Sequence, residues 1–264
     1  MTDTTGNTVV SGRSGKRSSR SQGRSCSAAR RKAIVSHLSA ADKKLANLIE
    51  QVGPFSMKVD ELQSGYEALA ESIVYQQITG KAAQSILAKV RANLGHSNNP
   101  DNFPTPQTIL SASLEDLRAC GLSRSKGMAL HDLALKSLPD ENGLTVVPSI
   151  EEMHALTDDE LIQRLTQIRG IGPWTVQMLL IFRLGRLDVL PATDYGVRKG
   201  FALTYFSKSR LKPVAKPSTK ADGKLKKAEM VLPTPTEIAK KAECWRPFRS
   251  AASWYLWRAL ELER

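Results

Sequence analysis

The chain of 264 residues has little cysteine, little histidine and no long apolar run. Its three cysteines, Cys26, Cys120 and Cys244, lie far apart and form no CxxC pair, so we expect neither a disulfide framework nor a zinc site. The four histidines show no ligand spacing, and we assign none of them to a metal. No stretch of about 18 apolar residues occurs, so we expect no contact with a membrane.

Regular alternation of polar and apolar residues is also missing, and no internal repeat is visible. A half-buried strand would show that alternation, so its absence disfavours a sheet. Apolar residues recur instead at helical spacing, in segments bounded by capping residues. The expected helices cover residues 41–52, 66–77, 81–94, 114–120, 126–138, 157–168, 236–244 and 247–262. The predicted fold is therefore all-α, with about ten short helices.

Positive charge is concentrated in two segments of the chain. The net charge is +12, yet residues 1–36 alone hold eight Lys and Arg against one acid. Residues 207–232 hold another eight against two acids, which leaves the rest of the chain close to neutral. A basic balance is typical of proteins with a polyanionic partner. Here it lies outside the helical pattern, so it says little about an active site.

We expect residues 1–36 to be a disordered basic tail and residues 37–264 to be the folded helical domain. The tail has too few large apolar residues to offset its ordering entropy. Non-specific DNA contact, nuclear targeting and organelle targeting are three open interpretations of it. Residues 207–232 are expected to be a flexible Lys- and Pro-rich insertion, because helical pattern resumes after them. Whether the insertion contacts DNA or is only solvated stays open.

A glycine-rich turn between two helices is the most informative local pattern. A helix ends near Ile168, the turn Arg169-Gly170-Ile171-Gly172 follows, and Pro173 begins the next helix, where its missing N–H costs nothing. Glycines let the backbone approach a ligand closely, and the N–H groups at the start of the new helix can bind an anion. Such a turn can hold a DNA phosphate without reading the base sequence. An ordinary αα-hairpin is the alternative interpretation.

An acidic residue follows this turn at 22 positions after Gly172. Either Thr193 or Asp194 could cap the helix that comes next. A carboxylate at a helix start, close to a phosphate site, has a second possible use. It could stabilise positive charge on a sugar, or orient a water towards the anomeric carbon.

The turn and the acid, at this spacing, resemble the helix-hairpin-helix (HhH-GPD) superfamily of DNA glycosylases. Within it, the chain is most similar to the 3-methyladenine DNA glycosylase II group. The further stretches that carry this resemblance are residues 72–78 (SIVYQQI), 103–106 (FPTP), 121–126 (GLSRSK) and 245–250 (WRPFRS). The resemblance covers about residues 40–206 and 233–262. It implies a two-lobed helical fold, here without the N-terminal α/β domain of the bacterial enzyme.

The resemblance also implies roles for individual residues. Asp194 matches the catalytic aspartate. Gly170, Ile171 and Gly172 match the turn whose amides hold a phosphate, in the family often with a monovalent cation at the backbone of residues 168–172. Further residues implied at the DNA are Thr175, Gln76, Gln77 and Ile78, and one of the last three would insert as a wedge after base flipping. The implied base pocket comprises Trp174, Met178, Tyr75 and Trp257.

The residue at position 174 indicates which of the family's two reactions is expected, base release alone or base release with strand cleavage. In the bifunctional branch of the family this position is a lysine, which attacks the sugar as an amine. Trp174 cannot form a Schiff base, so we expect base release without AP lyase activity. An indole face also favours a positively charged alkylated purine, by about 0.5–2 kcal/mol. The iron–sulfur branch needs four closely spaced cysteines where this chain has only Cys244, so we expect no cofactor.

Other conspicuous residues are expected to be structural. Trp174, Met178, Leu179, Ile181 and Phe182 fall at helical spacing, which makes most of them core residues, and Trp245, Trp254 and Trp257 are also expected in the core. For Met178 the core and the pocket lining are equally good interpretations. Arg249 is expected to bind a carboxylate or a helix end rather than DNA.

The sequence therefore predicts a monofunctional DNA glycosylase of base excision repair. It would flip out alkylated bases, such as 3-methyladenine and 7-methylguanine, and hydrolyse the N-glycosidic bond. The expected partner is double-stranded DNA with alkylated bases, bound by a monomer, in the nucleus if the chain is eukaryotic and in the cytoplasm or nucleoid otherwise. Two alternatives are a non-catalytic DNA-binding protein that keeps the turn, and a glycosylase for deaminated or oxidised bases.

Overall fold

The computed structural model describes residues 27–60, 62, 64–95, 103–207 and 231–263. In that part of the chain it contains only helices, which confirms the prediction of an all-α fold. The helices are α1 (Ala28–Ala41), α2 (Lys43–Val52), α3 (Gly65–Tyr75), α4 (Gly80–Leu94), α5 (Pro106–Ser111), α6 (Leu114–Ala119), α7 (Arg124–Lys136), α8 (Ile150–Ala155), α9 (Asp158–Leu165), α10 (Pro173–Phe182), α11 (Tyr195–Tyr205), α12 (Pro235–Ala242), the 3-10 helix η1 (Glu243–Trp245) and α13 (Arg249–Leu262).

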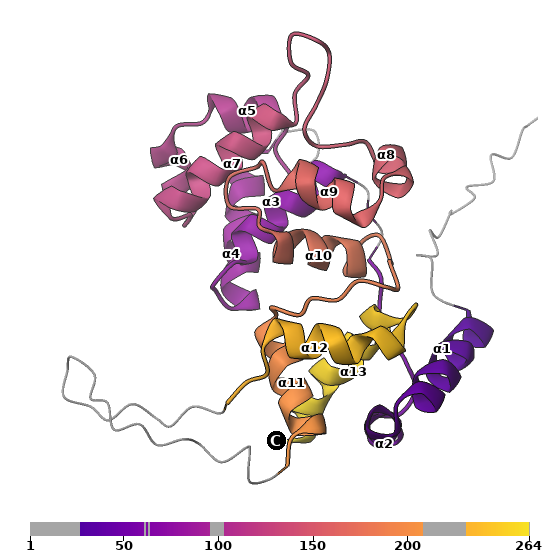
Figure 1. The fold of residues 1–264 in the computed structure, drawn as a ribbon. Coiled ribbons are helices and arrows are strands. Elements are labelled where there is room, and N and C mark those ends of the chain that lie inside the picture. The colour runs from indigo at the N-terminus through magenta and orange to yellow at the C-terminus, as the bar shows by residue number, and fades with distance from the viewer. Residues whose placement is uncertain (1–26, 61, 63, 96–102, 208–230, 264) are drawn as a thin grey trace, which may run out of the picture.

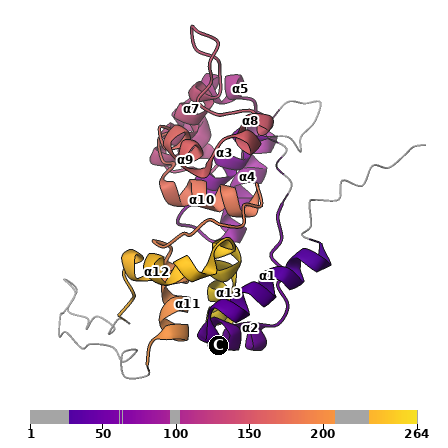
Figure 2. The same ribbon diagram turned by 45° about the vertical axis from the view of Figure 1, so that its right-hand side comes forward.

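The helices gather in two lobes (Figures 1 and 2). Helices α3 to α10 form the first lobe, and α1, α2, α11, α12 and α13 form the second. The chain passes from the second lobe to the first after α2 and returns after α10. The segment between α10 and α11 therefore lies where the two lobes meet.

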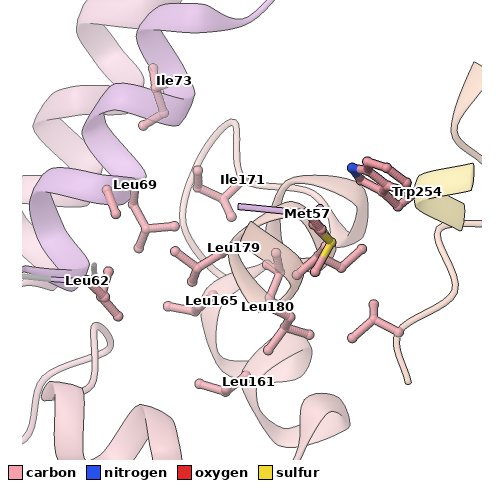
Figure 3. Close-up of a cluster of buried hydrophobic side chains, with 14 of the residues drawn as sticks. Met57, Leu62, Leu69, Ile73, Leu161, Leu165, Ile171, Leu179, Leu180 and Trp254 are labelled. Carbon is pink, nitrogen blue, oxygen red and sulfur yellow. The ribbon is translucent and has the colours of Figure 1, made fainter. Parts of the chain in front are cut away.

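Helix α10 occupies the side of the first lobe that faces the second. Its sequence, PWTVQMLLIF, is apolar on most faces, as expected for a helix that is covered on several sides. Figure 3 shows Leu179 and Leu180 packed among buried leucines of α9 and α3, with Met57 and Trp254 on the side of the second lobe. The first turn of α10 is less covered, since Pro173 and Trp174 are both exposed.

Close contact between α11 and α13 organises the second lobe. Gly200 of α11 is buried, and a Cβ atom placed on it would lie 2.0 Å from the carbonyl oxygen of Leu256 in α13. Only glycine therefore permits this approach of the two backbones. The contact fixes the position of α13 relative to the start of α11, where Asp194 lies.

A buried carboxylate joins four parts of the second lobe. Asp42, which is 4% exposed, caps α2 through backbone amides. Its Oδ2 atom accepts hydrogen bonds from Tyr205 Oη at 2.8 Å and Trp245 Nε1 at 3.1 Å, and pairs with Lys241 Nζ at 2.7 Å. Burial alone would raise the pKa of Asp42, but the hydrogen bonds from Lys241, Trp245 and Tyr205 outweigh it and leave the pKa lowered.

Helix α1 corrects the predicted boundary of the basic tail. Residues 28–36 were expected to be disordered within a tail of residues 1–36, but they form the first part of α1. The side chains of Ile34 and Leu38 are fully buried, and Ser27 caps the helix by accepting a hydrogen bond from the amide of Arg30. Two apolar residues spaced i, i+4 thus dock a helix that is otherwise mostly polar. Residues 1–26 and 208–230 of the two basic segments lie outside the described residues.

Three negative findings apply to the described residues. None of their helices combines the length and the apolarity needed to cross a membrane. No group of three or more His, Cys, Asp or Glu among them could hold a metal ion. Cys120 is buried and Cys244 is exposed, and both are free thiols.

Candidate active site

The predicted turn between α9 and α10 has an open backbone. Gly170 adopts a φ of +80°, a conformation that favours glycine, and the amide of Ile171 donates to the carbonyl oxygen of Ile168 at 3.0 Å. Gly172 precedes α10 without any side-chain cap, and nothing lies within 4 Å of the position that its Cβ would take. No side chain therefore caps the first amides of α10, which leaves them available to an anion. Ile171 itself is buried, so its backbone rather than its side chain is available to a ligand.

Two side chains of helix α7 bind the backbone that leads into the turn. Asp132 Oδ2 accepts a hydrogen bond from the amide of Arg169 at 2.6 Å and pairs with Lys136 Nζ at 2.8 Å. Lys136 Nζ also donates to the carbonyl oxygen of Gln167. These contacts fix the backbone of residues 167–169, which leads into the turn, while the side chain of Arg169 stays exposed.

Asp194 is held by three hydrogen-bond donors. Its Oδ1 atom accepts from the amide of Val197 and from Trp257 Nε1, each at 2.7 Å, and its Oδ2 atom accepts from Trp174 Nε1 at 2.9 Å. The contact with Val197 identifies Asp194 as the cap of α11, which decides between the two expected candidates. Among the described residues Asp194 forms no salt bridge, so its negative charge is oriented by neutral donors without being compensated by a cation.

The two tryptophans around Asp194 differ in their surroundings. Trp174 in the first turn of α10 is 44% exposed. Trp257 of α13 is half-buried, and its ring centroid lies 5.5 Å from that of Phe182. Gly196 makes room for it, because a Cβ atom there would lie 2.7 Å from Trp257 Cδ1. One indole is therefore free to contact a ligand, while the other is fixed against the carboxylate.

A pocket of about 800 Å³ extends along α10 beside Trp174. Six of the residues that line it were predicted at the base pocket or the DNA: Tyr75, Gln76, Gln77, Trp174, Thr175 and Met178. Met178 thus lines the pocket, although it also packs against the core. Trp257 and Ile78 are not part of the lining. Trp257 was expected to be a pocket aromatic, and the structure directs its N–H at Asp194 instead.

Five residues of the lining were not predicted: Asp60, Glu71, Ser72, Phe182 and Arg183. Trp174, Met178 and Phe182 are spaced i, i+4, i+8 along α10, so the helical period could have identified Phe182. Asp60 comes from the segment before α3, and no sequence signal places it beside α10. The structure brings it there through a hydrogen bond from its amide to the carbonyl oxygen of Phe182, at 2.9 Å.

The segment between α3 and α4 meets the glycine turn. Gln76 Nε2 donates to the carbonyl oxygen of Gly170 at 2.8 Å, which links two parts that were predicted separately to contact DNA. Gln77 has a φ of +58°, a left-handed conformation that costs a non-glycine residue free energy. Ile78 next to it is 37% exposed. Lys126 Nζ donates to the carbonyl oxygen of Val74 at 2.7 Å, and burial lowers the pKa of Lys126.

Other predicted structural roles are confirmed. Arg249 binds a carboxylate, with its Nε atom 2.8 Å from Asp188 Oδ1. Trp245 and Trp254 are buried core residues. Helix α9 begins after Thr157, where the expected helix 157–168 starts, and Thr157 and Glu160 form a capping box there.

Comparison with known proteins points in the same direction as this geometry. The family model "HhH-GPD superfamily base excision DNA repair protein" matches residues 70–227. The chain is 36% identical over 227 residues to DNA-3-methyladenine glycosylase 1 of Schizosaccharomyces pombe, with 86% of each chain covered. It is 30% identical over 207 residues to DNA-3-methyladenine glycosylase of Saccharomyces cerevisiae, covering 75% of this chain and 67% of that one.

Solved structures agree in fold. The Schizosaccharomyces pombe 3-methyladenine DNA glycosylase in complex with abasic DNA superposes with a TM-score of 0.66 at 35% identity, covering 86% of this chain and 95% of that one. A DNA-3-methyladenine glycosidase from Bacillus halodurans superposes with a TM-score of 0.64 at 26% identity, covering 86% and 88%.

Proposed function

The chain belongs to the HhH-GPD superfamily of base excision DNA repair proteins, and on that premise we propose that it is a monofunctional 3-methyladenine-type DNA glycosylase. It hydrolyses the N-glycosidic bond of alkylated bases and leaves an abasic site. The observation that carries this proposal is the pair of hydrogen bonds from Trp174 and Trp257 to Asp194. They orient the carboxylate beside Trp174, which itself lines the pocket, although Asp194 does not.

DNA binding in this proposal relies on the backbone of the turn. The amides at the start of α10 bind a phosphate, and the segment of residues 76–78 enters the base stack and replaces the flipped nucleotide. The hydrogen bond between Gln76 and Gly170 keeps these two contacts in a fixed relation. A monovalent cation at the backbone of residues 168–172 stays a prediction; the carbonyl oxygens of Ile168 and Gly170 already accept hydrogen bonds within the protein.

The chemistry proposed for Asp194 is electrostatic. A flipped base stacks on the exposed indole of Trp174 and occupies the pocket beside it. As the bond from the base to C1′ breaks, the electron pair leaves with the base and positive charge develops on the sugar. The carboxylate of Asp194 stabilises that charge and orients the water whose oxygen bonds to C1′ and which then releases one proton to the solvent. An N-alkylated purine is a cation before cleavage, so it leaves as a neutral base and needs no strong general acid.

Absence of a reactive amine supports a monofunctional reaction. Neither the described residues that line the pocket nor the side chains that contact Asp194 include a lysine. A Schiff base with C1′, which precedes strand cleavage in bifunctional enzymes, therefore has no nucleophile here.

The proposed partner is double-stranded DNA with alkylated bases. The relative from Schizosaccharomyces pombe was solved with abasic DNA, the product of such a reaction, which supports a DNA substrate for this chain. We also propose that the protein acts as a monomer, in the nucleus of a eukaryote or the cytoplasm or nucleoid of a prokaryote.

The test is release of 7-methylguanine and 3-methyladenine from methylated duplex DNA, with strand nicking measured in parallel. We expect release by the wild type, loss of release in Asp194→Asn, and no nicking without added base. Asp159→Asn is the matched control, because Asp159 is exposed and makes no hydrogen bond or ion pair within the described residues. Tight DNA binding without release of any base by the wild type would instead favour a non-catalytic DNA-binding protein.

A further inference from the structure

The polar lining of the pocket contains three charged side chains among the described residues: Asp60, Glu71 and Arg183. Two of them are compensated. Glu71 Oε2 pairs with Arg183 at 2.8 Å, and Glu71 Oε1 pairs with Arg91 at 3.1 Å. Arg91 in turn pairs with Glu67 at 3.0 Å. Two carboxylates and two guanidinium groups thus form a neutral network across α3, α4 and α10.

Asp60 is different, because its carboxylate has no partner. Its amide is tied to the carbonyl oxygen of Phe182, but its side chain makes no hydrogen bond or ion pair within the described residues. Two other polar side chains of the lining are engaged, since Ser72 donates to the carbonyl oxygen of Ala68 and Gln76 to that of Gly170. Asp60 therefore gives the described lining an uncompensated negative charge.

The position of Asp60 sets how this charge can act. Trp174 and Phe182 are eight residues apart on α10, about 12 Å along the helix axis. A base stacked on Trp174 therefore occupies one end of the pocket, and Asp60 lies beside Phe182 at the other. Asp60 is exposed, so over this separation its charge attracts a cation weakly, and the attraction is measurable only at low ionic strength, where the Debye length exceeds the separation.

We propose that Asp60 is a specificity-determining residue, which makes the pocket favour cationic N-alkylated purines over neutral lesion bases. This inference rests on the proposed glycosylase function. Trp174 contributes to cation binding through its indole face, and Asp60 adds a fixed charge from the opposite end. Neutral bases that stack equally well are not attracted by Asp60. The residue therefore changes the ratio of the release rates of cationic and neutral bases.

The test compares Asp60→Asn with the wild type and with Asp159→Asn, which removes an exposed aspartate on α9. Single-turnover rates are measured on duplexes that contain either 7-methylguanine, which is cationic, or hypoxanthine, which is neutral. At low ionic strength we expect Asp60→Asn to lower the 7-methylguanine rate about twofold, to leave the hypoxanthine rate unchanged, and to lose this effect at high salt. The proposal would be overturned if the ratio of the 7-methylguanine rate to the hypoxanthine rate did not change, whether neither rate fell or both fell equally.

A binding measurement separates this inference from the proposed function. In the Asp194→Asn background the DNA stays intact, and affinity is compared for duplexes with 7-methylguanine and with guanine. At low ionic strength, adding Asp60→Asn should reduce the preference for 7-methylguanine about twofold. If the wild type released no base, the proposed function would fail while this arm still decided the role of Asp60. An unchanged preference in this arm would refute the role.

Discussion

Trp257 Nε1 lies 2.7 Å from Oδ1 of Asp194, the same oxygen that accepts a hydrogen bond from the amide of Val197. The carboxylate therefore has one oxygen committed to two donors within its own lobe. Its other oxygen has a single donor, from the exposed Trp174. This asymmetry makes Oδ1 the anchored oxygen and Oδ2 the one that a bound sugar can approach. Trp257 is accordingly a positioning residue.

Replacing Trp257 with Phe should slow catalysis and leave DNA affinity unchanged. Phenylalanine keeps much of the packing against Phe182 but removes the N–H donor. A hydrogen bond to a charged group is worth about 1.5–3 kcal/mol, so we expect kcat to fall at least about tenfold. Single-turnover release and DNA titration measure the two quantities. Trp254→Phe, a core change on the same helix, is the control, and an equal rate loss in both variants would contradict the role of Trp257.

Gly196→Ala should reproduce the effect of Trp257→Phe. The added Cβ would lie 2.7 Å from Trp257 Cδ1 and push the indole away from Asp194. Because both changes break the same contact, the double variant should be no slower than either single one. Gly200→Ala is the contrasting control: its Cβ would meet the backbone of Leu256, so it should lower the free energy of unfolding instead. Additive rate losses in the double variant would show that the two residues act separately.

Gln77→Gly should raise stability and weaken DNA binding. Glycine adopts the observed φ of +58° without strain, so the free energy of unfolding should rise by about 1 kcal/mol. The variant also loses the side chain that would enter the base stack, so affinity for lesion DNA should drop. Gln84→Gly, in the exposed middle of α4, should instead lower the free energy of unfolding by about 1 kcal/mol. Unchanged affinity in Gln77→Gly would assign the wedge to a neighbouring residue.

Asp42 should make stability depend on acid pH. Its pKa is lower in the folded than in the unfolded chain, so its contribution is complete above the unfolded value of about 4 and is lost as pH falls through the folded value. Asp42→Asn should lower the free energy of unfolding by about 2 kcal/mol at neutral pH. This is less than for a fully buried ion pair, because Lys241 is partly exposed. The variant should also lose less stability than the wild type on acidification. Thermal unfolding from pH 7 to pH 3 measures both effects, and parallel curves would contradict this role.

Features coded by neighbouring residues could be predicted from the sequence. The turn at 169–172, the helix start at Pro173 and the cap at Asp194 each depend on a few consecutive residues, and the structure has all three. Helix α7 likewise lies where a helix was expected at residues 126–138, and it begins two residues earlier, after the cap Ser123. The short helices α5 and α8 were not predicted, whereas α6, also six residues long, was expected at residues 114–120, ahead of Gly121, a residue type that favours a helix end.

Features that depend on tertiary contact could not be predicted. Asp60 reaches the pocket only because its amide is bound to Phe182, about 120 residues later in the chain. The indole of Trp257 faces Asp194 because Gly196 leaves space for it, and no local pattern encodes that direction. Helix α1 was missed for a different reason. Its Ser- and Arg-rich start outweighed the single apolar pair, Ile34 and Leu38, that docks it.

The hydrogen bond between Trp174 and Asp194 joins the two lobes, since α10 belongs to the first and α11 to the second (Figure 1). The aromatic platform and the carboxylate thus lie in different lobes, and one continuous cluster of buried hydrophobic side chains joins those lobes. The packing of that cluster sets the distance between base and acid, although neither Trp174 nor Asp194 belongs to it. A substitution among its side chains, far from the pocket, would therefore lower the rate by moving the two groups apart.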